Sequence, residues 1–101
     1  MFGLPEDTIS LLVHYFRTRS DIVEVRVYGS RAMGTESPGS DIDLAIVSTT
    51  ETDISGSVKT DLDELPTPYL FDVTDYRRIT YAPLREHIDS VGKLLYSRKI
   101  K

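Results

Sequence analysis

The segment GSRAMGTESPGSDIDL at residues 29–44 decides the fold, because it joins the end of one predicted strand to the start of the next. Residues 23–28 precede it and alternate valine with polar or aromatic residues, which is typical of a strand with one buried face. The sequence SPGS at residues 37–40 requires a loop and leaves room for only about one or two helical turns before it. Alternation resumes at Asp41 and predicts a second strand over residues 41–47.

Further helices and strands are predicted on both sides of this segment. Apolar residues at helical spacing predict a helix over Pro5–Arg19, and a weaker stripe within residues 49–65 predicts a short helix after a mobile connection. Residues Tyr69–Val73 are predicted as a third strand. A last helix is expected near Tyr81, with an apolar face made of Leu84, Ile88, Val91 and Leu95. The pattern predicts an α/β (α+β) fold in which residues 1–101 form one domain, a small mixed β-sheet flanked by helices.

Length and composition restrict the classes of function. A chain of 101 residues has a thin core, and a deep pocket that encloses two substrates is not expected. The net charge of -4 and the scattered basic residues argue against a surface for long DNA or RNA, and so against a template-directed polymerase. The sequence has no cysteine, no start typical of a secretory signal and no apolar run of membrane-spanning length. We therefore expect a cytoplasmic protein without disulfides or thiolate metal sites.

Two aspartates at the start of the second predicted strand are candidate metal ligands. Asp41 and Asp43 are two residues apart, so on a strand their carboxylates leave the same face and repel each other. Mg²⁺ would relieve this repulsion, since it prefers a few carboxylate oxygens together with water and substrate phosphate. The alternative is a solvated strand edge on which Asp41 caps a turn.

Asp72 is the candidate third carboxylate. It lies between Phe71 and Val73, which predict a sheet interior where an unpaired carboxylate would be costly. A third strand that brings Asp72 beside the first two aspartates would resolve this cost through a shared metal. The alternative is an acid at a strand end that bonds to a local turn or to Arg77 or Arg78, and Asp75 is expected to be a turn or cap residue.

Gly29 and Ser30 are candidate phosphate-binding residues. Glycine lets the backbone approach a ligand closely, and the start of a helix offers free N–H groups, to which the Ser30 hydroxyl would add a donor. The alternative is a turn glycine followed by a capping serine. A P-loop is excluded because no lysine follows Gly34. An EF-hand is excluded by Ala45, Ile46 and Thr52, and His14 and His87 lack the spacing of zinc ligands.

Taken together, Gly29-Ser30, the ten residues that follow and Asp41-Ile42-Asp43 resemble the G-S-x10-D-x-D signature of the DNA polymerase beta-like nucleotidyltransferase superfamily. The chain is most similar to the minimal members called MNT. The resemblance includes Phe71-Asp72-Val73 as the strand of the third carboxylate and extends to the closing segment 88–96. One departure is Met33, where many relatives carry an arginine, and Arg31 is the nearer candidate for a phosphate contact.

The resemblance implies a role for each matched residue. Asp41 and Asp43 would hold two Mg²⁺ ions, and Asp72 would ligate the catalytic ion and help to activate the attacking hydroxyl. Gly29 and Ser30 would bind the β- and γ-phosphates of ATP. The implied reaction is in-line attack at the α-phosphate with release of pyrophosphate.

The acceptor must come from a partner or from a second copy of the chain, because so small a domain supplies one wall of a site. Small members of the family act as antitoxins that transfer AMP to a tyrosine of a helical HEPN-type toxin, and this is the function the resemblance implies. One alternative is nucleotidyl transfer to a small hydroxylated molecule such as an aminoglycoside, which a substrate screen would detect. Another is a non-catalytic binding module, for which the Asp41→Asn, Asp43→Asn variant would still neutralise the partner.

Overall fold

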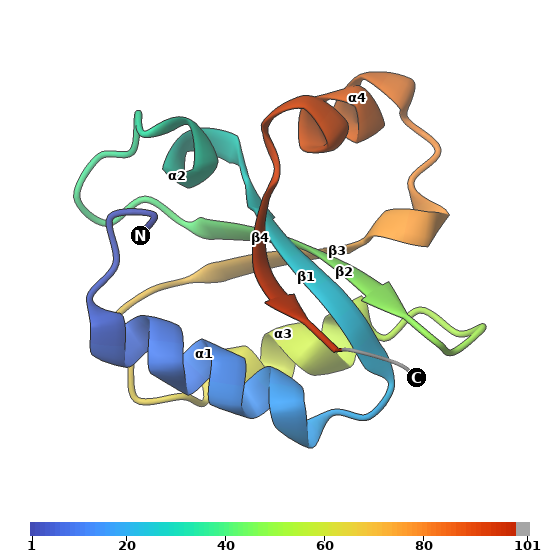
Figure 1. Ribbon diagram of the computed structural model, residues 1–101, viewed down its shortest axis with the longest axis horizontal. Coiled ribbons are helices and arrows are strands. Elements are labelled where there is room, and N and C mark those ends of the chain that lie inside the picture. The colour runs from blue at the N-terminus through green and yellow to red at the C-terminus, as the bar shows by residue number, and fades with distance from the viewer. Residues whose placement is uncertain (99–101) are drawn as a thin grey trace.

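A computed structural model describes residues 1–98 of the chain (Figure 1). Its helices and strands are, in order, α1 Glu6–Thr18, β1 Ile22–Tyr28, α2 Gly29–Met33, β2 Ile42–Ser48, α3 Ser55–Asp63, β3 Phe71–Asp75, the 3-10 helix η1 Tyr76–Arg78, α4 Ala82–Val91 and β4 Lys93–Ser97. The predicted first helix is confirmed to within one residue at each end. No helix in the described part of the chain is both long enough and apolar enough to cross a membrane.

The strands form one mixed sheet in the order β3-β2-β1-β4. Strand β1 is antiparallel to both of its neighbours, whereas β2 and β3 are parallel. A parallel pair needs a crossover connection, which α3 supplies between β2 and β3. The predicted mixed sheet flanked by helices is therefore confirmed, and β3 is left at the edge of the sheet.

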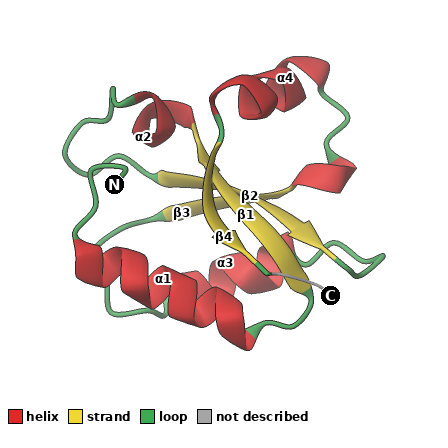
Figure 2. Cartoon of the chain, in the orientation of Figure 1, coloured by secondary structure: helices red, strands yellow, loops and turns green. Residues whose placement is uncertain are grey.

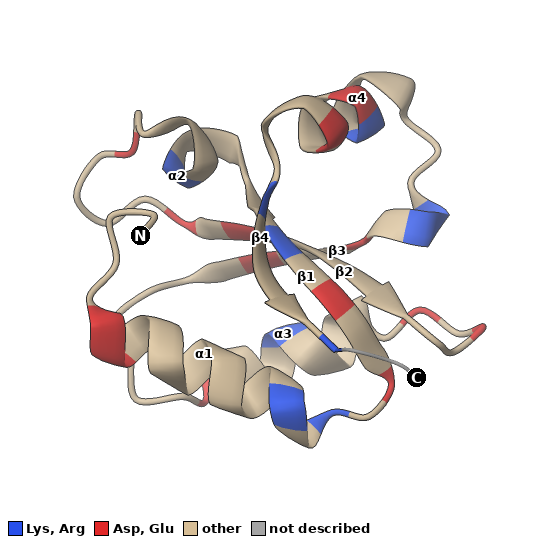
Figure 3. Cartoon of the chain, in the orientation of Figure 1, with Lys and Arg blue, Asp and Glu red and all other residues tan. Residues whose placement is uncertain are grey.

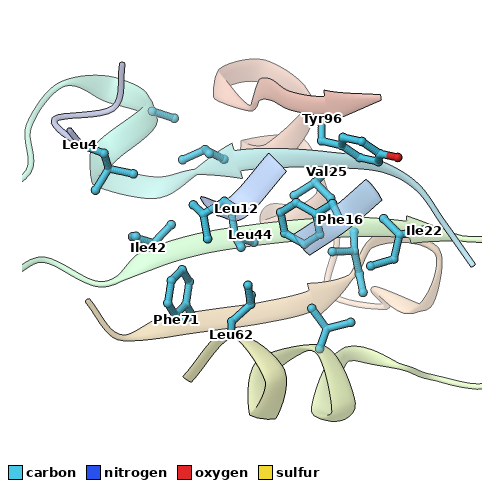
Figure 4. Close-up of a cluster of buried hydrophobic side chains, with 14 residues drawn as sticks. Leu4, Leu12, Phe16, Ile22, Val25, Ile42, Leu44, Leu62, Phe71 and Tyr96 are labelled. Atoms are coloured by element: carbon cyan, nitrogen blue, oxygen red, sulfur yellow. The ribbon is translucent and has the colours of Figure 1, made fainter. Parts of the chain in front are cut away.

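The main core lies on the face of the sheet that α1 and α3 cover (Figures 1, 2 and 4). Alternate residues of the central strands point to this face, as the period of two predicts. The fully buried side chains of this core include Leu12, Phe16, Ile22, Val25, Val27, Ile42, Leu44, Ile46, Val58 and Leu62. Their burial holds β1 and β2 rigidly in the middle of the sheet.

The opposite face of the sheet is covered over only part of its area. Tyr28 of β1 and Ala45 of β2 pack there against Ile88 of α4, with Tyr76, Ile79 and Leu84 around them. Each of the three central residues of this second cluster is at least nine-tenths buried. Helix α4 is thus anchored on the sheet, while the ends of β2 and β3 beyond it remain accessible.

The structure corrects the prediction for the C-terminal segment. The expected apolar face of the last helix included Leu95, but the helix ends at Val91 and Leu95 lies in the fourth strand, β4. The Gly92 N–H donates to the Ile88 carbonyl oxygen and closes the helix, after which residues 93–97 pair with β1. The leucines at 94 and 95 fit both a helical stripe and an edge strand, so spacing alone misassigned them.

Two element boundaries also differ from the prediction. Strand β3 begins at Phe71 instead of Tyr69, because pairing with β2 starts where the Ile42 N–H donates to the Leu70 carbonyl oxygen. Helix α3 begins at Ser55 and contains Gly56 in its first turn. The first amide groups of a helix have no partner within it, so a glycine costs less there than in the interior.

Candidate active site

The sheet brings the predicted third carboxylate beside the first two. In the parallel pairing of β2 with β3, Asp43 lies directly opposite Asp72. Asp41 lies one residue before β2 begins. Acidic segments on these two neighbouring strands are visible in Figure 3. Residues that are about thirty positions apart in sequence therefore meet at one end of the sheet, on the face that α4 leaves accessible.

The surroundings of Asp43 raise its proton affinity. Partial burial raises the pKa of Asp43, and the nearby charges of Asp72 and then Asp41 raise it further. Among the described residues, no side chain donates a hydrogen bond or forms a salt bridge to any of the three aspartates. The protein thus concentrates negative charge there and does not neutralise it.

This arrangement predicts that Asp43→Asn stabilises the fold at neutral pH. A raised native pKa means that the folded state holds the proton more tightly than the unfolded state, so ionised Asp43 opposes folding and stability falls as pH rises through its titration range. We expect the variant to gain about 0.5 kcal/mol at pH 7, the magnitude typical of like charges on paired strands. The gain should disappear at acidic pH, where the wild-type carboxyl is protonated. Urea unfolding at both pH values measures it, and equal stability at pH 7 would contradict it.

The three aspartates fit an open Mg²⁺ site better than a closed one. Within residues 1–98, no group of three or more His, Cys, Asp or Glu side chains is arranged to hold a metal by itself. Mg²⁺ is commonly bound through one or two carboxylates, with water and substrate phosphates completing the coordination. An unneutralised acidic group that includes Asp43 and Asp72 has the donor chemistry for such a site. The two ions that the resemblance implies stay a prediction.

The Gly29 turn lies against this acidic group. Gly29 has a φ of +70°, a conformation that glycine adopts without strain. A Cβ on Gly29 would overlap Oδ2 of Asp43. The backbone N–H of Gly29 donates to Nε2 of His87 over 3.1 Å. The predicted close approach of Gly29 is therefore directed at a carboxylate, and Ser30 follows it as the second residue of α2.

The burial predicted for Asp72 is wrong. Asp72 is exposed, although Phe71 beside it is buried. The reason is that β3 is an edge strand and that Asp72 points to the face that α4 does not cover at this end. Desolvation of Asp72 consequently gives no argument for a metal, and its position opposite Asp43 carries the argument instead.

The buried acid of β3 is Asp75, at 4% exposure. Its side chain accepts a hydrogen bond from the Arg77 backbone N–H over 3.1 Å, and its Oδ2 lies 3.4 Å from Nε of Arg78. The prediction that Asp75 is a cap residue is confirmed. These arginines therefore interact with Asp75 and not with Asp72.

The structure gives Arg31 a set of partners within the protein. Its guanidinium is buried, donates twice to the Ser40 carbonyl oxygen at 2.8 and 3.1 Å, and donates to the Phe2 carbonyl oxygen at 3.0 Å. It also lies over the ring of Tyr69. Arg31 therefore ties the N-terminal segment to the loop that leads into Asp41. A phosphate contact would require these bonds to break, and it stays a prediction.

Replacement of Arg31 by methionine is expected to destabilise the fold by about 2 kcal/mol, because hydrogen bonds from a charged group to buried carbonyl oxygens are lost. Methionine keeps the apolar stem but has no donor. Thermal unfolding measures the change, with the exposed Arg17 replaced by methionine as the control. Equal effects of the two substitutions would show that the Arg31 bonds contribute little.

One protein family matches most of the chain. The family described as "Polymerase beta, Nucleotidyltransferase" matches residues 11–101. The chain belongs to this family. Among proteins with curated descriptions, none matches the sequence. The matched range includes the Gly29 turn, both strands of the acidic group and α4, so this nucleotidyltransferase domain contains every site residue considered above.

Solved structures show the same fold at low sequence identity. A chain of the MntA-HepT toxin-antitoxin complex superposes with a TM-score of 0.70 at 16% identity, over 93% of this chain and 74% of that one. A chain from a toxin-antitoxin crystal structure with AMP-PNP has a TM-score of 0.64 at 22% identity, over 95% and 76%. A third match is a chain from the complex of a tri-AMPylated Shewanella oneidensis HEPN toxin with an MNT antitoxin. It has a TM-score of 0.64 at 20% identity, over 97% of this chain and 74% of that one. The expected similarity to MNT proteins is confirmed at the level of the fold.

The residue that sequence analysis missed at this site is His87. Its spacing from His14 does not fit a zinc site, so the sequence predicts an exposed or hydrogen-bonded histidine without a role at the site. In the structure it is partly buried between α4 and the Gly29 turn. The sequence does hint that His87 lies near the sheet, because the next residue, Ile88, is on the predicted apolar face of the helix. Only the packing of α4 on the sheet shows that His87 reaches the Gly29 turn.

Proposed function

We propose that this nucleotidyltransferase transfers AMP from ATP to a hydroxyl, most simply that of a tyrosine, on a helical HEPN-type partner, and thereby acts as an antitoxin. The observation that supports the chemistry most strongly is the pairing of Asp43 with Asp72, beside Asp41 and against the Gly29 turn. The partner is suggested by similar folds, which occur in toxin-antitoxin complexes that include an AMPylated HEPN toxin.

Each of the site residues would have a separate role in the reaction. Asp41 and Asp43 would hold Mg²⁺, with Asp72 as a further ligand on the side of the incoming hydroxyl. Mg²⁺ at such a site lowers the pKa of a bound hydroxyl and neutralises charge on the phosphates. The turn at Gly29 and Ser30 would position the β- and γ-phosphates. The acceptor oxygen then bonds to the α-phosphorus, the bond from that phosphorus to the pyrophosphate oxygen breaks, and the hydroxyl proton leaves through the acidic group.

The exposure of the acidic group is consistent with a macromolecular acceptor. Asp72 is exposed and Asp43 is only partly buried, so nothing in the described chain encloses a second substrate. A partner protein that docks over this end of the sheet would bring its own hydroxyl and exclude water at the same time. A small acceptor would lack this second wall.

Mass spectrometry of a HEPN-type partner, incubated with this chain, ATP and Mg²⁺, tests the function. We expect the partner to gain the mass of one or more AMP groups, and fragmentation to place them on tyrosine. A stable complex without any mass gain would instead favour a module that neutralises by contact. Transfer to a small hydroxylated molecule, with none to the partner, would overturn the proposed acceptor while leaving the chemistry intact.

A further inference from the structure

One side chain of α4 crosses to the acidic end of the sheet. The Nε2 atom of His87 accepts the Gly29 N–H over 3.1 Å. The His87 ring also meets the ring of Tyr28 edge to face, with centroids 6.0 Å apart. His87 thus contacts the last residue of β1 and the first residue of α2, the two positions between which the chain leaves the sheet.

This contact defines the state of the imidazole. A nitrogen that accepts a hydrogen bond carries no proton, so His87 is neutral here with its proton on Nδ1. The Gly29 N–H is occupied as well, because it donates its hydrogen bond to His87. Neither the Gly29 N–H nor the Nε2 atom of His87 is free to contact a ligand while the bond exists.

The helix that carries His87 is held firmly. Ile88, the next residue, is 1% exposed and packs against Tyr28 and Ala45 of the central strands. His87 therefore reaches the turn from a support that cannot shift without opening the second cluster. The same turn also lies so close to Asp43 that no Cβ fits at Gly29.

We propose that His87 is a positioning residue that holds the Gly29-Ser30 turn in place beside Asp43. The turn is then held by its hydrogen bond to α4 and by its close packing on the carboxylate, so its distance from the acidic group is set by the protein before any nucleotide binds. Such preorganisation reduces the ordering cost of binding. The link to nucleotide binding rests on the proposed function, whereas the structural part does not.

Nuclear magnetic resonance of the full chain without nucleotide tests the structural part. We expect ¹⁵N shifts of a neutral His87 with its proton on Nδ1, and slow hydrogen exchange of the Gly29 amide. His87→Phe should speed that exchange at least about ten-fold, because the amide loses its acceptor. His87→Gln should restore most of the protection, since its side-chain oxygen can accept the same bond. A proton on Nε2, or unchanged exchange in His87→Phe, would overturn the proposal.

Binding of the β,γ-imido analogue of ATP with Mg²⁺, measured by calorimetry, tests the link to the site. His87→Phe is expected to weaken binding by about ten-fold and His87→Gln by no more than about three-fold, as for loss and retention of one hydrogen bond. His14→Phe, an exposed histidine on α1, is the matched control and should change nothing. Equal binding by wild type and His87→Phe would overturn the link. If the wild type binds no nucleotide while the Gly29 exchange behaves as expected, the proposed function fails and the positioning role stands.

Discussion

Replacement of both Asp41 and Asp43 by asparagine is expected to reduce AMP transfer by at least about 10³-fold, the effect seen when charge stabilisation is removed from a transition state. The two substitutions leave Asp72 as the sole carboxylate of the acidic group, so Mg²⁺ loses most of its negative ligands. The rate of AMP incorporation into the partner measures the loss. The asparagine side chains should fit the same space, because asparagine has nearly the same shape as aspartate.

The control separates loss of chemistry from loss of folding. Because ionised Asp43 opposes folding, the variant should be at least as stable as the wild type, and unfolding curves show whether it is. Asp63→Asn removes an aspartate that forms a surface ion pair with Lys59 on α3, and it should leave transfer unchanged. A double variant that keeps transfer within about ten-fold of wild type would refute the assignment of these ligands, since loss of one charged catalytic group normally costs more.

Gly29→Ala is expected to damage both the fold and the reaction. A side chain at a φ of +70° costs about 1 to 2 kcal/mol. The added Cβ also overlaps Oδ2 of Asp43, and displacing a packed neighbour costs about 1 to 3 kcal/mol more. We expect a total of about 3 kcal/mol in urea unfolding. Transfer should be lost even where the protein is folded, because Asp43 must move aside.

Gly34→Ala is the matched control for this prediction. Gly34 has a similar φ of +75°, but no atom lies within 4 Å of the position of its Cβ. The control should therefore cost only the backbone contribution of about 1 to 2 kcal/mol and leave transfer intact. If both variants lose the same stability and the same transfer activity, the close approach of Gly29 to Asp43 does not matter for the reaction.

The sequence predicted the parts of the fold that depend on local pattern. Period-two alternation located β1 and β2, and helical spacing located α1, because each pattern reflects one buried face. The strand β4 was missed, since two adjacent leucines satisfy a helix and an edge strand equally well. Which neighbours a segment pairs with is a tertiary property, and residues 93–97 have no local feature that reveals β1 as their partner.

At the site, too, local pattern predicts the residues, whereas their burial and contacts depend on tertiary packing. Gly29, Asp41, Asp43 and Asp72 were singled out from residue type and spacing, and the structure places Asp43 opposite Asp72. The burial of Asp72 was misjudged because its apolar neighbours point to the opposite face of an edge strand. The contacts of His87 depend on how α4 crosses the sheet, and those of Arg31 on where the N-terminal segment lies. No sequence pattern predicts either set of contacts.

The measurement that tests the central claim most directly compares ATP labelled at the α-phosphate with ATP labelled at the γ-phosphate. Each is incubated with this chain, Mg²⁺ and a HEPN-type partner, and the partner is then isolated. Transfer of AMP predicts that the partner retains the α-label and never the γ-label, while labelled pyrophosphate appears from the γ-labelled substrate. Retention of the γ-label, or of neither label by a partner that binds the chain stably, would contradict nucleotidyl transfer at this site.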